Sequence, residues 1–141
     1  MENITVTQIE TLLRNICFDI KKKGREILSD YDITPPQFDA LQFLINEGEM
    51  TVSELSGKLF LAPSTITDLI DRMEKNSLVI RIRDESDRRI VKVQVQEKGH
   101  SLIGLVIARR CNYLQTLLKN MAVEDMERFA GYLEILAAKS I

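Results

Sequence analysis

The sequence has few of the features expected of an enzyme or a membrane protein. Its single histidine, His100, has no serine–acid set at a motif spacing, and the chain has no glycine-rich phosphate loop and no HExxH motif. No apolar run approaches the roughly 18 residues of a membrane span. The N-terminus lacks the order of basic, apolar and small residues that marks a signal peptide. We therefore expect a protein that is not an enzyme, has no cofactor and does not associate with a membrane.

Cysteine is also scarce. Cys17 and Cys111 lie far apart and form no CxxC pair, which favours a reduced, cytoplasmic setting. Cys17 falls on an apolar helical stripe, so we expect a core position for it, with thiol-based redox sensing as the alternative. His100 and Cys111 share a helix face, but a zinc site would need two more ligands. We expect no metal here, and instead an exposed histidine and a buried thiol.

Length and charge distribution narrow the possibilities further. A chain of 141 residues with no glycine/serine linker, internal repeat or low-complexity tract predicts a single domain over 1–141. The net charge of −2 argues against a generally basic coat for nucleic acid. Residues 72–92 nevertheless hold seven basic and four acidic side chains, which gives this segment +3 and the remainder −5. A local basic patch suits a site-specific DNA binder, although a solvated surface is the simpler alternative.

The stretch 51–95 predicts two helices followed by a hairpin. Thr51 and Glu54 have the spacing of a capping box, and Pro63 suits the first position of a second helix. The segments 78–83 and 91–95 alternate apolar and polar residues with a period of two, which is typical of half-buried strands. The charged segment 84–89 joins them. Two helices and a basic hairpin in this order make a winged helix-turn-helix.

Long amphipathic segments flank this lobe. Apolar residues recur in steps of three and four over about 5–30, and again over about 97–139. Thr34 is expected to cap a helix that starts at Pro35, and Gly48 to end that helix in a left-handed C-cap. The terminal helices are apolar over a wider arc than one core contact requires. We therefore expect them to pack on a second chain, with a bundle that closes on itself as the alternative.

The serial arrangement of five short motifs resembles the MarR family of bacterial transcription regulators. These motifs are Thr34-Pro-Pro-Gln-Phe38, Ser64-Thr-Ile-Thr67, Asp71-Arg-Met-Glu-Lys75, Asp87-Arg-Arg89 and Glu97-Lys-Gly99. The resemblance covers nearly the whole chain. It implies a mainly α fold with a small β wing, a winged lobe over about 34–96 and dimerisation helices over about 5–30 and 97–139. It also implies a homodimeric repressor that binds a pseudo-palindromic operator in double-stranded DNA and is relieved by a small-molecule effector.

The resemblance also suggests site residues. Ser64, Thr65, Thr67 and Asp68 match the positions at which the recognition helix meets bases and phosphates, and Arg88 matches the arginine that enters the minor groove. The full expected DNA-binding set is Ser64, Thr65, Thr67, Asp68, Arg72, Lys75, Arg83, Asp87, Arg88 and Arg89. Asp87 and Arg89 are expected to shape the wing. Phe18 and Phe38 are candidate walls of an effector pocket, and Cys17 is the candidate redox residue.

Some residues depart from the family pattern. Asp68 stands where many members have a basic side chain, so it changes base preference, forms a cap or ion pair, or removes DNA binding. Ser77 stands where glycine is usual, so a left-handed turn there would be strained. Val95-Gln96 replaces a common Leu-Thr and loses a good N-cap. Besides a redox sensor through Cys17, a winged-helix module that binds protein and not DNA therefore stays open.

Overall fold

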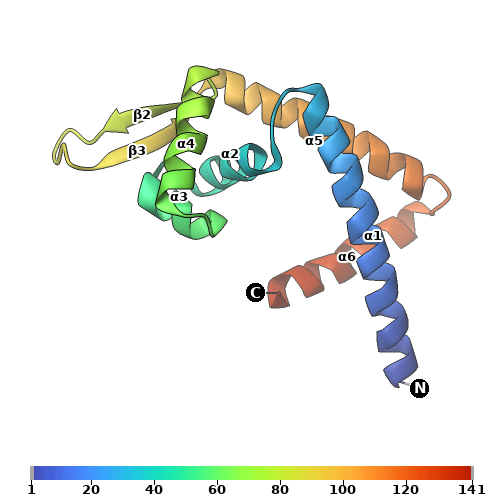
Figure 1. The fold of residues 1–141 in the computed structure, drawn as a ribbon. Coiled ribbons are helices and arrows are strands. Elements are labelled where there is room, and N and C mark those ends of the chain that lie inside the picture. The colour runs from blue at the N-terminus through green and yellow to red at the C-terminus, as the bar shows by residue number, and fades with distance from the viewer. Residues whose placement is uncertain (1, 141) are drawn as a thin grey trace. The chain divides into compact units, whose positions relative to one another are not determined.

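The computed structural model describes residues 2–140, and the side chains of residues 5–140. The chain divides after Ile107 into two compact units, which are described separately. The helices are α1 (Glu2–Asp30), α2 (Pro35–Glu47), α3 (Val52–Leu59), α4 (Pro63–Lys75), α5 (Glu97–Leu118) and α6 (Val123–Lys139). The strands are β1 (Met50–Thr51), β2 (Val79–Arg83) and β3 (Val91–Val95). The mainly α fold with a small β wing is confirmed (Figure 1).

Local capping sets the helix starts where the sequence predicts them. The Thr34 hydroxyl accepts from the Gln37 N–H, and the Gln37 side chain accepts from the Thr34 N–H, so a full capping box precedes α2. The Thr51 hydroxyl accepts from the Glu54 N–H at 3.1 Å and caps α3. Proline occupies the first position of both α2 and α4. The first turn of a helix leaves its N–H groups without partners. The threonine caps supply partners to some of them, and proline has no N–H that needs one.

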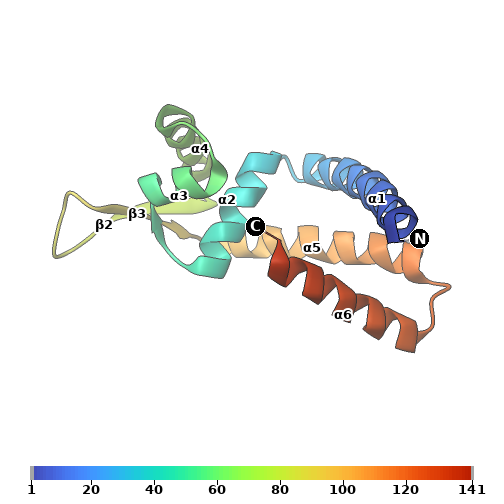
Figure 2. The same cartoon turned by 90° about the horizontal axis from the view of Figure 1, so that it is seen from below.

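The three strands form an antiparallel sheet in the order β1-β3-β2. β3 pairs with β2 from Val79↔Val95 to Arg83↔Val91, and with β1 through Met50↔Val93. The two-residue strand β1 was missed at the sequence level, because a strand that short carries no periodic signal. The β2–β3 hairpin projects beyond the helices of the first unit (Figures 1 and 2).

The core of the first unit lies between the three helices of the lobe, the sheet and parts of α1 and α5. Its fully enclosed side chains come from every one of these elements: Ile27, Leu41, Leu55, Ile66, Ile70, Met73, Val79, Val93 and Val106. Phe38, an expected pocket wall, is only 8% exposed and belongs to this core. The helix α4 therefore rests on a packed base that fixes its orientation.

Several burial predictions are wrong. In β2 the isoleucines Ile80 and Ile82 are each 40% exposed, whereas Arg81 is half-buried, because Arg81 faces acidic side chains of α4. Cys17 and Cys111 are both exposed. Their apolar neighbours along the helices are exposed as well, so apolar spacing there does not mark a core within one chain.

Of the two backbone conformations expected from the sequence, one is present and the other differs. Ser77 has the left-handed conformation that the sequence predicts, with φ of 63°. Gly48 also has a positive φ, of 90°, but its ψ is −175°, so it is not the left-handed helical cap that was expected. That combination is essentially restricted to glycine. The Gly48 N–H still donates to the Leu44 carbonyl and closes α2.

The second unit consists of the end of α5 and the whole of α6. Residues from both helices and their connection line an open, mostly apolar hollow of about 590 Å³: Cys111, Leu114, Gln115, Leu118, Lys119, Met121 and Met126. None of the described residues of α6 is buried. Among the described helices, none has the length and apolarity to cross a membrane.

Gly99 allows α5 to approach the end of the wing closely. A methyl group built on Gly99 would lie 2.5 Å from the Leu78 carbonyl oxygen and 2.8 Å from Val95 Cγ1. The Leu78 oxygen also accepts from the Gln96 N–H at 2.9 Å, so this part of the backbone cannot move away freely. The glycine of the Glu97-Lys-Gly99 motif is therefore required by packing.

We predict that Gly99→Ala lowers the free energy of unfolding by about 1–3 kcal/mol, because the added methyl overpacks a fixed backbone contact. Urea denaturation followed by circular dichroism measures the change. Gly104→Ala on the same helix is the matched control, since its added methyl would meet no atom within 4 Å. The control should gain up to about 1 kcal/mol from helix propensity. Similar effects in both variants would contradict the packing role of Gly99.

Candidate nucleic-acid interface

The exposed face of α4 carries the polar residues that the sequence assigned to DNA contact. Ile66, Ile70 and Met73 face the core and are fully buried. The opposite face is exposed along its whole length and carries Ser64, Thr65, Thr67, Asp68, Asp71, Arg72 and Lys75. The helix begins at Pro63 after Ala62, which forms no side-chain cap. The N–H groups of the first turn, where Ser64 and Thr65 lie, therefore donate to no capping side chain.

Three residues of this face, Thr67, Asp68 and Arg72, already have partners on the same helix. The Thr67 hydroxyl donates to the Pro63 carbonyl at 3.0 Å. Asp68 Oδ2 lies 3.4 Å from Arg72 NH2, with both side chains about two-thirds exposed. Of the roles considered for Asp68, the single chain thus shows the ion pair. An exposed i,i+4 pair of this kind is weak, so it leaves both groups available to a partner.

The wing loop is held together by its own side chains. Asp84 Oδ2 accepts from the Ser86 hydroxyl and from the Asp87 N–H. Asp87 binds the Arg89 guanidinium through both carboxylate oxygens at 3.1 Å and also accepts from the Arg89 N–H. The expectation that Asp87 and Arg89 pair to shape the wing is confirmed. Arg83 NH1 donates to the Arg88 carbonyl at 2.8 Å and ties the strand to the loop tip.

These hydrogen bonds also set the charge state of the loop. The Ser86 hydroxyl, followed by the Asp87 N–H, lowers the pKa of Asp84. The Arg89 side chain, followed by the Arg89 N–H, lowers the pKa of Asp87, and Asp87 in turn raises the pKa of Arg89. Both carboxylates therefore stay ionised at neutral pH. The loop keeps its shape because charged donors and acceptors face one another.

Arg81 joins the wing to α4, a role that sequence reasoning missed. Its guanidinium contacts Asp71 Oδ1 at 2.7 Å and Glu74 Oε1 at 2.9 Å, and it approaches the Thr67 carbonyl at 3.4 Å. The second oxygen of Glu74 accepts from the Arg81 backbone N–H at 2.9 Å. Because β2 is an edge strand, this N–H has no strand partner, and Glu74 supplies one. We call Arg81, Asp71 and Glu74 the wing clamp.

The wing clamp and the loop leave few positive charges for a nucleic acid. Arg81, Arg83 and Arg89 are each engaged with groups of the same lobe. Among the described residues, the exposed side chains of Lys75 and Arg88 form no hydrogen bond or ion pair. The structure thus separates cations that shape the lobe from cations that are free to bind phosphate. Arg83 shapes the lobe through its bond to the Arg88 carbonyl, and its expected contact with DNA stays a prediction.

The residues expected to serve other roles lie apart from this surface. Phe18 is 64% exposed on α1, whereas Phe38 is buried. Cys17 is exposed on α1. The effector pocket and the redox site stay predictions.

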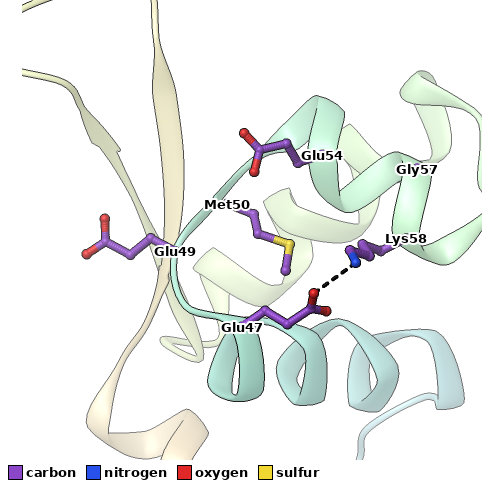
Figure 3. Close-up of a pocket in the computed structure, with 6 residues that line it drawn as sticks. All are labelled: Glu47, Glu49, Met50, Glu54, Gly57 and Lys58. Carbon is purple, nitrogen blue, oxygen red and sulfur yellow. Dashed lines mark ion pairs between the residues drawn. The ribbon is translucent and has the colours of Figure 1, made fainter. Parts of the chain in front are cut away.

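An acidic hollow lies elsewhere on the first unit, where α2, β1 and α3 meet. It measures about 410 Å³ and is lined by Glu47, Glu49, Met50, Glu54, Gly57 and Lys58. Glu47 and Lys58 point toward each other and form an ion pair at 2.8 Å (Figure 3). Glu49 accepts from the Gln94 side-chain amide at 3.0 Å. Three carboxylates against one lysine would repel phosphate, so this surface does not extend the candidate interface.

Comparisons with known proteins agree with this geometry. The model of the MarR family matches residues 33–91. A Bacillus subtilis protein, the uncharacterized HTH-type transcriptional regulator YsmB, is 50% identical over 124 residues, which are 88% of this chain and 85% of that protein. The structure of a MarR family protein from Bacillus stearothermophilus superposes with a TM-score of 0.89 at 47% identity, covering 99% of this chain and 97% of that chain.

A further solved structure is similar in fold. It is a mutant of Staphylococcus aureus MepR bound to an oligodeoxyribonucleotide, with a TM-score of 0.73. The match covers 94% of this chain and 98% of that chain. At 23% identity the likeness shows the fold alone.

We predict that Arg81→Ala lowers the free energy of unfolding by about 1–3 kcal/mol, because it leaves the carboxylates of Asp71 and Glu74 without their guanidinium partner. Urea denaturation is the measurement. Arg72→Ala is the matched control, since it removes an arginine from an exposed pair with one carboxylate. The control should change stability by less than about 0.5 kcal/mol. Equal losses would mean that the wing clamp is no stronger than a surface ion pair.

Proposed function

Because this chain belongs to the MarR family, whose members are DNA-binding transcription regulators, we propose that it is a homodimeric repressor of a pseudo-palindromic operator. Each copy would place one α4 in the major groove and one wing along the flanking minor groove. Binding of a small-molecule effector would release the DNA.

One observation carries the DNA-binding part of this proposal. The exposed polar face of α4 and the free Arg88 side chain belong to one lobe, and the wing clamp fixes the wing to α4. A rigid pair of reading elements can span a major groove and its neighbouring minor groove without losing much conformational freedom on binding. The first-turn N–H groups of α4, which have no side-chain cap, would be suitable donors to a phosphate.

Within α4, the side chains would divide between readout and positioning. Ser64, Thr65 and Thr67 have hydroxyl groups that bind either base edges or phosphates. Asp68 can accept from cytosine N4, and its weak pair with Arg72 would break at little cost. Lys75, near the C-terminal end of the helix, would bind the phosphate backbone. Arg88 would enter the minor groove, whose negative potential is strongest where the groove is narrow.

Exposed apolar side chains support a homodimer. On α1 the residues Val6, Leu12 and Phe18 are each more than half exposed. On α6, Leu136 and Ile135 are exposed as well, and no described residue of that helix is buried. Apolar helix faces of this extent are stabilised when a second chain removes them from water. Two-fold symmetry would then match a palindromic site, with half-site centres about 34 Å apart.

Control by an effector follows from the same geometry. A ligand that changed the separation of the two lobes would abolish simultaneous binding to both half-sites. To convert 99% competent protein into 1%, it must favour the incompetent spacing by about 5.5 kcal/mol. Phe18 and Phe38 are our candidate pocket residues. Oxidation of Cys17 is the alternative trigger, and its exposure makes the thiol accessible in the isolated chain.

We predict that Arg88→Ala weakens binding to duplex DNA from upstream of the gene by about 5- to 150-fold, which corresponds to about 1–3 kcal/mol. The salt dependence should also become shallower by about 0.9 if the arginine neutralises one phosphate. Fluorescence anisotropy over a series of potassium chloride concentrations measures both quantities. Arg25→Ala on α1 removes the same charge outside the candidate interface and should leave affinity unchanged. Weak binding that is indifferent to Arg88 would instead favour a protein-interaction module.

We predict that the purified protein has twice the mass of one chain, and that Leu133→Glu shifts it toward the monomer. The added carboxylate would have to be buried in an apolar interface, at a cost of several kcal/mol. Multi-angle light scattering measures the mass, and the neighbouring Glu134→Gln variant controls for a change on the same helix. A monomeric wild-type protein at micromolar concentration would contradict the homodimer.

A further inference from the structure

Three helices of the first unit end in the same hydrogen-bonded turn. In each turn one N–H bonds to a carbonyl five residues back and the preceding N–H to a carbonyl three residues back: Ile33 to Leu28 and Asp32 to Ser29, Leu61 to Ser56 and Phe60 to Gly57, Leu78 to Met73 and Ser77 to Glu74. This is the Schellman motif, which requires a left-handed residue just past the helix. Glycine is the usual residue there, because a Cβ atom is sterically unfavourable in that conformation.

One of the three turns has a large apolar residue, Phe60, in the left-handed position. Asp32 and Ser77 have short polar side chains, with φ of 55° and 63°. Phe60 has φ of 54° and carries a large apolar ring that is 94% exposed. The next residue of this turn, Leu61, packs against the core, and the Ser56 hydroxyl fixes the turn by donating to the Leu61 carbonyl at 2.6 Å. The ring therefore contributes neither to the turn nor to the core.

Phe60 precedes the start of α4 along the chain. It lies in the connection between α3 and α4, three residues before Pro63 and four before Ser64. Ser64 and Thr65 are exposed in the first turn of α4, four and five residues after Phe60. In helix-turn-helix proteins the N-terminal residues of the recognition helix lie closest to the base edges. A fixed aromatic side chain at this point would reach the duplex together with them.

We propose that Phe60 is a DNA-contacting residue, which places its ring against apolar groups of the duplex beside the N-terminal end of α4. This inference rests on the DNA binding proposed above. Two parts of a duplex offer such groups: the 5-methyl of thymine in the major groove and the carbons of deoxyribose. Contact with either removes an exposed ring from water, which offsets the unfavourable backbone conformation.

The test compares stability with DNA affinity in the same variants. Phe60→Gly removes both the ring and the unfavourable Cβ, so its melting temperature should equal or exceed that of the wild type, whereas its affinity for the upstream duplex should fall about tenfold. Phe60→Ala keeps the Cβ and should lose affinity to the same extent. Phe60→Tyr keeps the ring and should retain affinity. Ser77→Gly is the matched control, because it relieves the same backbone conformation at the other end of α4 without altering affinity.

A uracil-substituted duplex separates the two kinds of contact. If the ring contacts a thymine methyl, replacing thymine by uracil throughout the site should weaken the wild-type protein more than Phe60→Ala. If it contacts deoxyribose, uracil should affect both proteins equally while Phe60→Ala remains weaker on every duplex. Both results support the proposal.

Unchanged affinity of Phe60→Gly and Phe60→Ala, with a wild-type protein that binds and depends on Arg88, would overturn the Phe60 contact while leaving the proposed function intact. A wild-type protein that does not bind DNA would overturn both. A loss of affinity in Ser77→Gly equal to that in Phe60→Gly would also overturn the contact. Such a result would mean that the changed backbone conformation of the turns, and not the missing ring, weakens binding.

Discussion

The wing clamp is the interaction on which the geometry of the lobe depends. Arg81 is held by Asp71 and Glu74 of α4, and Glu74 also binds the backbone of the edge strand β2. A β hairpin attached only through its own turn would move independently of the helices. The clamp instead fixes the wing relative to α4, and with it the position of Arg88. The interaction is electrostatic and involves only three side chains, yet it sets the relation between the two elements expected to read DNA.

The distribution of charge shows why counting basic residues overstates the binding surface. The segment 72–92 carries seven cations, but several of them hold the wing together. Carboxylates on the same lobe bind Arg81 and Arg89, and a backbone carbonyl binds Arg83. The remaining free cations are few, so their placement matters more than their number. The acidic hollow on the same unit would add repulsion if DNA approached from the wrong side.

The wrong burial predictions share one cause. An apolar stripe indicates that a face avoids water, but not which partner covers it. On α1 the stripe that contains Cys17 is exposed in the single chain, and the same holds for Cys111 on α5. In β2, the alternation correctly predicted a strand but did not indicate which of its two faces is buried, and Ile80 and Ile82 lie on the exposed face. The face of β2 that carries Arg81 is the partly buried one, because Arg81 pairs with two acidic side chains of α4.

The sequence by itself determined the order, type and approximate limits of the elements other than β1. Caps, first-position prolines and the change of period from 3.6 to 2 act over a few residues, so they can be read without knowing the fold. The pairing of Asp87 with Arg89 was predictable for the same reason. Only the tertiary structure decided the pairing of β1 with β3, the close approach at Gly99 and the partners of Arg81. These depend on groups that distant parts of the chain bring together, and no local pattern encodes which groups will meet.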